Sequence, residues 1–193
     1  MTSRRILTVG ALLLVGSLSL WAWAQANADQ SESTQSLAAN PDARFPVVSG
    51  SNLERRRFNL PADFEGDLNL VAVAFLREHQ DLVDTWTATA TRLTEADPAL
   101  RFYELPLLSE TNGLFSLFID GGMRAGIPSR ATREATITLY LDRAKFLKTA
   151  GLPGPQTIYL LLTDRAGTIF WRGQGAYTPA QGAALEEAIR RVR

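Results

Sequence analysis

Residues 71–86, VAVAFLREHQDLVDTW, read as a buried strand that runs directly into a helix. The apolar run from Asn69 to Phe75 is continuous, which is typical of a strand that is covered on both faces of a sheet. A helix is expected from Glu78 to Ala96, because its apolar residues fall at helical spacing. His79, the only histidine of the chain, lies in the turn between the two elements. Since many enzymes place a nucleophile or a phosphate site at such a turn, it is the first candidate site.

The rest of the chain alternates between strand and helix patterns. Further strands are expected at 53–60, 101–107, 136–141, 157–163 and 168–172, and further helices at 112–125, 144–150 and 179–192. Strands that alternate with helices predict a parallel sheet with helices on both faces. The turn at 164–167 joins the last two strands into a hairpin, which is expected to add an antiparallel edge. The sequence therefore predicts an α/β fold.

Composition excludes several kinds of chemistry. The chain has 193 residues, is 46% hydrophobic and 21% charged, and carries no formal net charge. It lacks the basic excess of a nucleic-acid-binding protein. The absence of cysteine excludes thiol catalysis, disulfides and thiolate metal sites, and a single histidine excludes a histidine-rich metal site. We therefore expect no cofactor and no metal.

The N-terminus has the pattern of an export signal. Residues 1–28 combine a basic start, an apolar run and the small-x-small sequence ANA at 26–28, which predicts a cleaved signal peptide. The alternative is an uncleaved anchor, because residues 6–24 are long and apolar enough to associate with a membrane. Residues 29–43 are polar and predict a flexible linker, so the domain spans 44–193. Either way we expect the domain outside the cytoplasm, as a periplasmic or secreted protein or anchored to the inner membrane.

Residues 157–175, TIYLLLTDRAGTIFWRGQG, resemble the strand–turn–strand of redoxins and peroxiredoxins. The resemblance implies a thioredoxin-like fold of the redoxin type. This fold is a three-layer sandwich, with a mixed central sheet, helices on both faces, and a C-terminal β-hairpin plus helix. Redoxins hold their reactive cysteine pair at the positions of Gln80 and Val83, and a cis-proline at the position of Gln156. None of these residues can carry out the family's chemistry, so no redox or other enzyme activity is expected.

A second resemblance extends from residue 69 to about residue 177. The chain resembles the mitochondrial ATP-synthase assembly factors of the ATP10 type, which are thioredoxin-like proteins without the redox pair. The matching motifs are Gln80, Val83 and Trp86, then MRAGIP at 123–128, then Ile169, Trp171, Gly173 and Gly175. Members of that family are membrane-associated chaperones for an ATP-synthase membrane subunit. The resemblance implies a protein or peptide partner and a role as an assembly factor or chaperone.

Two other functions remain open from the residues alone. A cofactor-free hydrolase or isomerase could use His79 as a general base with Asp81 or Asp84. However, the helical spacing places Asp84 on a different face from His79, and Asp81 is only two residues away. The other alternative is a degenerate redoxin with a purely structural role. A solvated histidine at the start of the helix is the simpler interpretation of His79.

The predicted binding surface lies around the lost redox site. Arg124–Arg133 is the most basic stretch of the domain, and we interpret it as an exposed loop that could contact an acidic partner or lipid headgroups. Trp171 is expected on an exposed side of the hairpin, where an aromatic ring could bind an extended polypeptide. The predicted surface comprises Arg77, His79, Gln80, Trp86, Arg124, Arg130, Gln156 and Trp171. Trp86 also fits the helix's core face, which is the competing interpretation of that residue.

Overall fold

The computed structural model describes residues 43–109 and 121–193. The predicted signal or anchor, the linker up to residue 42, and most of the helix predicted at 112–125 lie outside these residues. None of the helices in the described ranges is both long and apolar enough to cross a bilayer.

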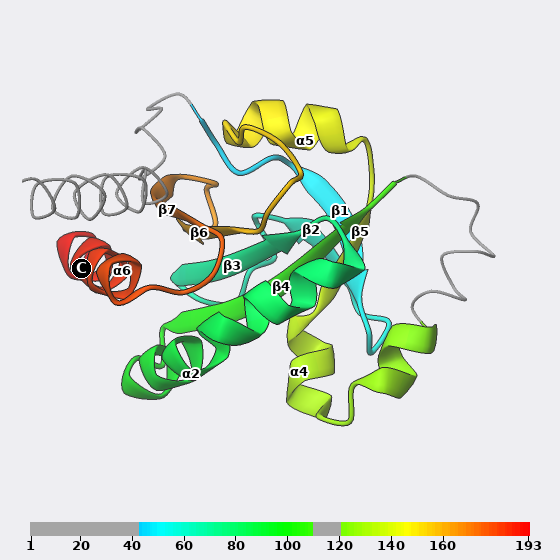
Figure 1. Cartoon of the computed structure of the whole chain (residues 1–193), viewed down its shortest axis with the longest axis horizontal. Coiled ribbons are helices and arrows are strands. Elements are labelled where there is room, and N and C mark those ends of the chain that lie inside the picture. Colours follow the sequence, from blue (N-terminus) through cyan, green and yellow to red (C-terminus); the bar gives the residue numbers. More distant parts are fainter. Residues whose placement is uncertain (1–42, 110–120) are drawn as a thin grey trace, which may run out of the picture. The chain divides into compact units, whose positions relative to one another are not determined.

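The described residues form a seven-stranded mixed sheet in the order β2-β1-β5-β4-β3-β6-β7 (Figure 1). Strand β4 is parallel to both β3 and β5, and every other neighbouring pair is antiparallel. The strands span Val48–Asn52 (β1), Arg57–Leu60 (β2), Leu68–Ala74 (β3), Leu100–Leu108 (β4), Ile137–Tyr140 (β5), Tyr159–Thr163 (β6) and Ile169–Gln174 (β7).

Helices cover both faces of the sheet. Helices α2 (Gln80–Ala96) and α6 (Pro179–Arg191) pack on one face, where their apolar residues join a single core cluster with those of β3, β4 and β6. Helix α5 (Arg143–Ala150) lies on the opposite face (Figure 1), and its Phe146 packs edge-on against Phe45 with ring centroids 5.9 Å apart. The predicted three-layer α/β sandwich is therefore confirmed.

The strand and helix predicted around residues 69–96 are confirmed almost to the residue. β3 lies between parallel β4 and antiparallel β6, and six of its seven residues are buried, so both of its faces are covered, as its continuous apolar run predicts. A short 3-10 turn at Arg77–His79 (η1) then leads into α2. Four side chains of α2 are buried at helical spacing, namely Val83, Trp86, Thr89 and Ala90.

The predicted C-terminal hairpin is confirmed as an antiparallel edge of the sheet. Its second strand, β7, forms the edge of the sheet, and its first strand, β6, joins the hairpin to β3 by antiparallel pairing. The apolar run of β6 is buried throughout, which is the environment of an inner strand.

The N-terminal region forms a hairpin of which only β2 falls within the strand predicted at 53–60. β1 and β2 pair around a turn in which Arg55 has a positive φ of 68°. The side-chain oxygen of Asn52 accepts hydrogen bonds from the backbone N–H groups of Glu54 and Arg56, at 3.1 and 2.9 Å. Asn52 thereby closes the turn that takes the first half of the predicted strand, residues 53–56.

The loop predicted at 124–133 is also wrong. Residues 121–126 are helical. Helix α4 (Arg130–Ala135) follows after Pro128, and Ser129 caps it by accepting a hydrogen bond from the N–H of Thr132. The Ser129 cap starts a second helix within 124–133, a stretch whose charges alone suggested an irregular loop.

Candidate functional site

The β3–α2 junction, defined as residues 75–80, is closed by a hydrogen bond to its histidine. His79 is 4% exposed, and its Nδ1 accepts a hydrogen bond from the backbone N–H of Phe75 at 3.3 Å. The ring of Phe75 lies edge-on to both His79 and Tyr159, with centroids 6.3 and 6.1 Å away. His79 therefore closes the turn from within, and the interpretation of a solvated histidine is wrong.

The surroundings of His79 do not form a catalytic pair. Because Nδ1 accepts a backbone hydrogen bond, the proton of a neutral ring is on Nε2. The side chain of Asp84 instead accepts a hydrogen bond from Gln80 at 2.9 Å, and Asp81 is exposed. In the described ranges, no group of three or more His, Asp or Glu side chains is arranged to hold a metal ion.

A carboxyl group on β4 approaches the first turn of α2. Glu104 pairs with Ala72 of β3, so it points to the face of the sheet that α2 covers. Burial raises the pKa of Glu104, a hydrogen bond with Gln80 partly offsets this rise, and the charge of Asp84 adds to it. Glu104 was not among the residues predicted for the site. The only signal was a single acid within the strand pattern RFYELPL.

The loop before β6 lies at the same end of the sheet as the junction. β3 and β6 are antiparallel and Val73 pairs with Tyr159, so the end of β3 meets the start of β6. Tyr159 fixes the loop by donating its hydroxyl to the carbonyl of Gly154 at 2.8 Å. Gln156, which takes the place of the redoxin proline, is exposed in this loop.

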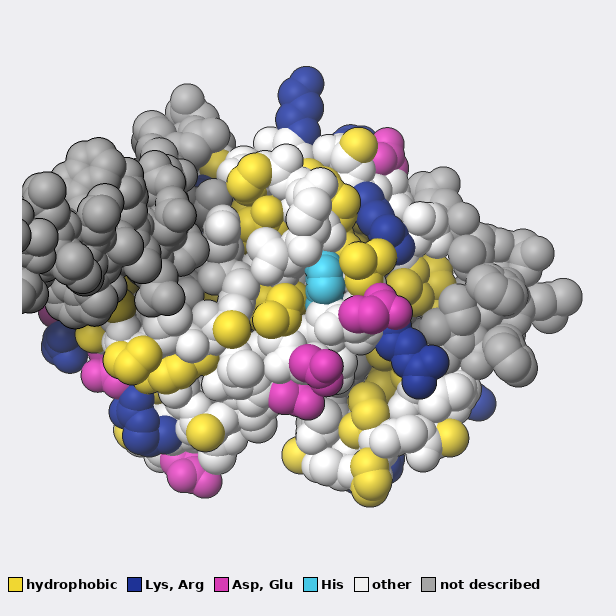
Figure 2. Space-filling view, in the orientation of Figure 1, with side chains coloured by type: hydrophobic (Ala, Val, Ile, Leu, Met, Phe, Trp, Pro, Cys, Tyr) yellow, Lys and Arg dark blue, Asp and Glu magenta, His cyan; other side chains and the backbone are white. Residues whose placement is uncertain are grey.

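An apolar side chain is exposed at the junction. Leu76 is 50% exposed, and among the described residues only Val47 is another large hydrophobic residue of this kind. Arg77 and Glu78, which follow Leu76, are exposed as well. Figure 2 shows this side of the molecule, where the histidine reaches the surface among apolar, acidic and basic side chains. The junction therefore combines a rigid turn with a small mixed surface.

The two tryptophans of the predicted surface have different environments. Trp86 is 0% exposed, donates its Nε1 proton to the carbonyl of Gly175 at 2.9 Å, and packs edge-on against Trp171 and Tyr177. It is therefore a core residue and cannot contact a partner. Trp171 is partly exposed, and its ring lies over Gly173, where an added Cβ would come within 2.4 Å of the ring.

The two arginines of the predicted surface lie away from the junction and bind their own chain. Arg124 donates to the carbonyl of Leu53 and to Glu54, at 2.9 and 3.0 Å. Arg130 pairs with Glu134 at 2.8 Å. The hydrogen bond from Arg133, at 2.6 Å, is the main reason why the pKa of Glu54 is lowered. The structure thus divides the predicted surface, with Arg77, His79, Gln80 and Gln156 at one end of the sheet and Arg124 and Arg130 near β1.

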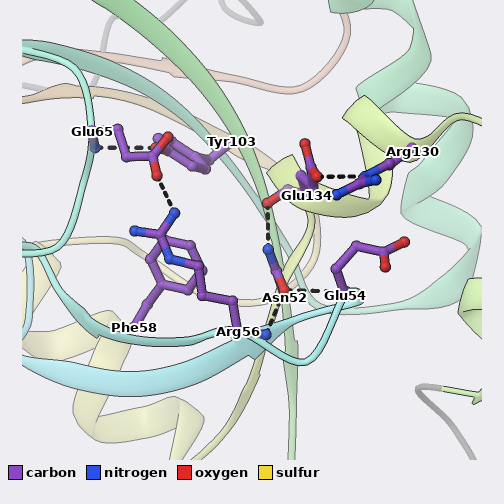
Figure 3. Close-up of a pocket in the computed structure, with 8 residues that line it drawn as sticks. All are labelled: Asn52, Glu54, Arg56, Phe58, Glu65, Tyr103, Arg130 and Glu134. Atoms are coloured by element: carbon purple, nitrogen blue, oxygen red, sulfur yellow. Dashed lines mark hydrogen bonds and ion pairs between the residues drawn. The ribbon is translucent and has the colours of Figure 1, made fainter.

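A charged cavity of about 360 Å³ lies beside the β1–β2 hairpin (Figure 3). Its lining residues are Asn52, Glu54, Arg56, Phe58, Glu65, Tyr103, Arg130 and Glu134. Arg56 lies over the ring of Phe58, 4.6 Å from its centroid, and pairs with Glu65. The hydroxyl of Tyr103 accepts the backbone N–H of Glu65 at 3.1 Å. Every charged side chain that lines this cavity has an ion-pair partner among the described residues, so the cavity offers a ligand no unpaired charge.

Solved structures share this architecture at low sequence identity. A protein from Aquifex aeolicus VF5, named as a candidate electron transport protein, has a TM-score of 0.55 and 10% identity over 79% of this chain and 98% of its own. An uncharacterized thioredoxin-like protein from Porphyromonas gingivalis has a TM-score of 0.50 and 14% identity over 79% of this chain and 93% of its own. A hypothetical protein from Sinorhizobium meliloti 1021 has a TM-score of 0.50 and 19% identity over 81% and 86%.

These likenesses establish the fold. The chain has a thioredoxin-like fold, and it contains no cysteine. No protein-family model and no curated protein sequence matches the chain.

Proposed function

We propose that this chain is a non-redox thioredoxin-like protein that binds a protein or peptide at the β3–α2 junction. The observation that carries the proposal is the half-exposed Leu76, which lies on a turn that His79 holds from inside. A rigid apolar contact loses little conformational entropy when a partner covers it. The neighbouring Arg77 and Glu78 supply a polar rim for the same contact.

The loop before β6 provides the second part of this surface. It lies at the same end of the sheet as the junction, and Gln156 is exposed in it with an amide that can donate and accept hydrogen bonds. An extended segment of a partner could place an apolar side chain on Leu76 and pair its backbone with this amide. This arrangement requires no nucleophile, metal or cofactor, and the chain acts without catalysis.

The resemblance to ATP10-type assembly factors suggests the kind of partner. We propose a subunit of a membrane complex, which the chain would assist during assembly. The N-terminal segment 1–28 supports a location outside the cytoplasm, with the domain in the periplasm or tethered to the membrane. Apolar segments that await insertion into a complex are suitable ligands for an exposed leucine with a charged rim.

The proposal is tested by comparing two exposed apolar residues. Leu76→Glu places a charge at the junction, whereas Val47→Glu makes the same change at a residue that is 89% exposed and outside the junction. Both full-length variants are purified from native membranes together with their bound proteins. We expect the specific partners of the wild type to be lost with Leu76→Glu and retained with Val47→Glu. The same set of partners with Leu76→Glu and with Val47→Glu would contradict the proposal.

A further inference from the structure

Strand β7 has an outer edge that no other strand pairs with in the described part of the chain. In an antiparallel ladder, the backbone groups of successive residues point alternately toward the neighbouring strand and away from it. The backbone N–H and C=O of Gln174 point away from β6, because both bond to the side-chain amide of Gln181, at 3.1 and 3.2 Å. By the same alternation, the backbone N–H and C=O of Arg172 also point to the outer edge.

Contacts within the chain already occupy both ends of the outer edge of β7. The Gln181 amide offers Gln174 one acceptor and one donor, as the peptide group of an added strand would. At the other end, Arg44 forms an isolated antiparallel bridge with Thr168. Between these two contacts, no residue in the described ranges pairs with the outer edge of residues 169–173. This open window fits a short extended segment.

The side chain of Arg172 is largely buried in the middle of this window. It is 8% exposed, and its Nε and Nη2 have no hydrogen-bond partner. On the face of the sheet that it shares with Leu161, no described carboxylate pairs with it. Burial lowers the pKa of Arg172, but a guanidinium stays charged in a folded protein. A buried charge that lacks a counter-charge is strongly unfavourable, so a ligand that supplies one is favoured.

We propose that the outer edge of β7 binds a short, extended, acidic peptide segment of a partner protein, with one carboxylate paired to Arg172. An added strand would complete the two outward backbone groups of Arg172. The peptide residue opposite Arg172 would have its side chain on the same face, where a carboxylate can form a bidentate pair with the guanidinium. A second copy that paired through its own β7 would not supply the carboxylate, because β7 contains no Asp or Glu. This surface is separate from the β3–α2 junction.

The test uses the full-length chain and three synthetic peptides in calorimetric titrations. The first peptide is acetyl-Thr-Val-Glu-Val-Thr-amide. The second has Lys in place of Glu. The third keeps Glu, but the backbone nitrogen of that Glu carries a methyl group. We expect only the first peptide to bind wild type well. Its affinity for Arg172→Met should fall by about thirtyfold or more, as for the loss of one partner of a buried charge pair.

The stability of the free variant separates this role from a structural one. Arg172→Met keeps most of the side-chain length and removes the unpaired charge, so its thermal midpoint should be equal to or above that of the wild type. A lower midpoint would overturn the proposal, because it would mean that Arg172 stabilises the free protein. Equal affinities for the Glu and Lys peptides, or unchanged binding by Arg172→Met, would overturn the role of the charge. Equal binding of the methylated peptide would overturn strand addition.

Discussion

The β3–α2 junction and the charged cavity beside β1 belong to the same domain but differ in how their polar groups are paired and exposed. The cavity gathers charged side chains, and each of them pairs with another part of the chain. The junction has few polar groups inside, with His79 bonded to the backbone, and it exposes Leu76 to solvent. A high density of charge therefore marks a self-contained structural region, and the region with an exposed apolar residue is the better candidate for binding.

The same difference appears in two carboxyl groups. Arg133 and Arg124 stabilise the ionised form of Glu54 at the cavity, and the pKa of Glu54 is lowered. Burial destabilises the ionised form of Glu104 beneath the junction, and the pKa of Glu104 is raised. The cavity thus stabilises a charged carboxylate, whereas the sheet beneath the junction disfavours one.

The largest effect is expected from Trp86, which anchors α2 behind the junction. Trp86→Ala removes a fully buried indole and its hydrogen bond to Gly175, so it should lower the free energy of unfolding by about 3–5 kcal/mol. Trp86→Phe keeps most of the contact with Trp171 and Tyr177 and should cost less. Urea denaturation measures both values. A small loss for Trp86→Ala would show that α2 is not anchored by its core face.

A smaller effect is expected from His79. His79→Ala leaves the buried N–H of Phe75 without an acceptor, so it should lower the free energy of unfolding by about 1–3 kcal/mol. His79→Asn is the matched control, because its side-chain oxygen can take the place of Nδ1. The alanine variant should therefore be the less stable of the two in urea denaturation. Equal losses for the two variants would mean that the hydrogen bond does not hold the turn.

The smallest effects are expected from the two carboxyl groups, and they should have opposite signs. Because the folded pKa of Glu104 is raised, its ionisation makes folding less favourable as pH rises above the ordinary carboxyl pKa of about 4.3. Glu104→Gln should therefore be more stable than wild type at neutral pH. The difference should shrink as pH falls toward that value.

Glu54 should show the reverse. Its folded pKa is lowered, so its stabilising contribution is complete above the ordinary carboxyl pKa and is lost as pH falls through the folded value. Glu54→Gln should be less stable than wild type at neutral pH and approach it in acid. Thermal midpoints at a series of pH values measure both variants. If both variants were more stable than wild type at neutral pH, or both less stable, the contrast between the cavity and the junction would be wrong.

The sequence predicted those parts of the fold whose residues carry a local pattern. The apolar run of β3, the helical spacing of Val83 and Trp86, and the turn at 164–167 each identify their element. The place of β6 inside the sheet could not be predicted, because it depends on pairing with a strand far away in the chain. The β1–β2 turn was missed for a related reason, since it is closed by one asparagine side chain.

The candidate site was predicted less completely than the fold. The position of the junction follows from the strand–helix pattern, but the burial of His79 does not, because it depends on the bond to the N–H of Phe75. Arg124 was assigned to the same surface from its charge, although its charge is satisfied by Glu54. Arg172 was not singled out at all. In the sequence, Arg172 is one polar residue within a strand pattern. Only the structure shows that its Nε and Nη2 lack a hydrogen-bond partner.

Site-specific photo-crosslinking in living cells tests the central proposal most directly. A photoreactive amino acid replaces Leu76 in one full-length protein and Val47, the more exposed apolar residue, in another. If the junction is the binding surface, a discrete crosslinked protein should form from position 76 and not from position 47. Its yield should fall when Gln156, on the neighbouring loop, is also replaced by Glu. Crosslinks of equal yield and identity from both positions, or none from position 76, would contradict the proposal.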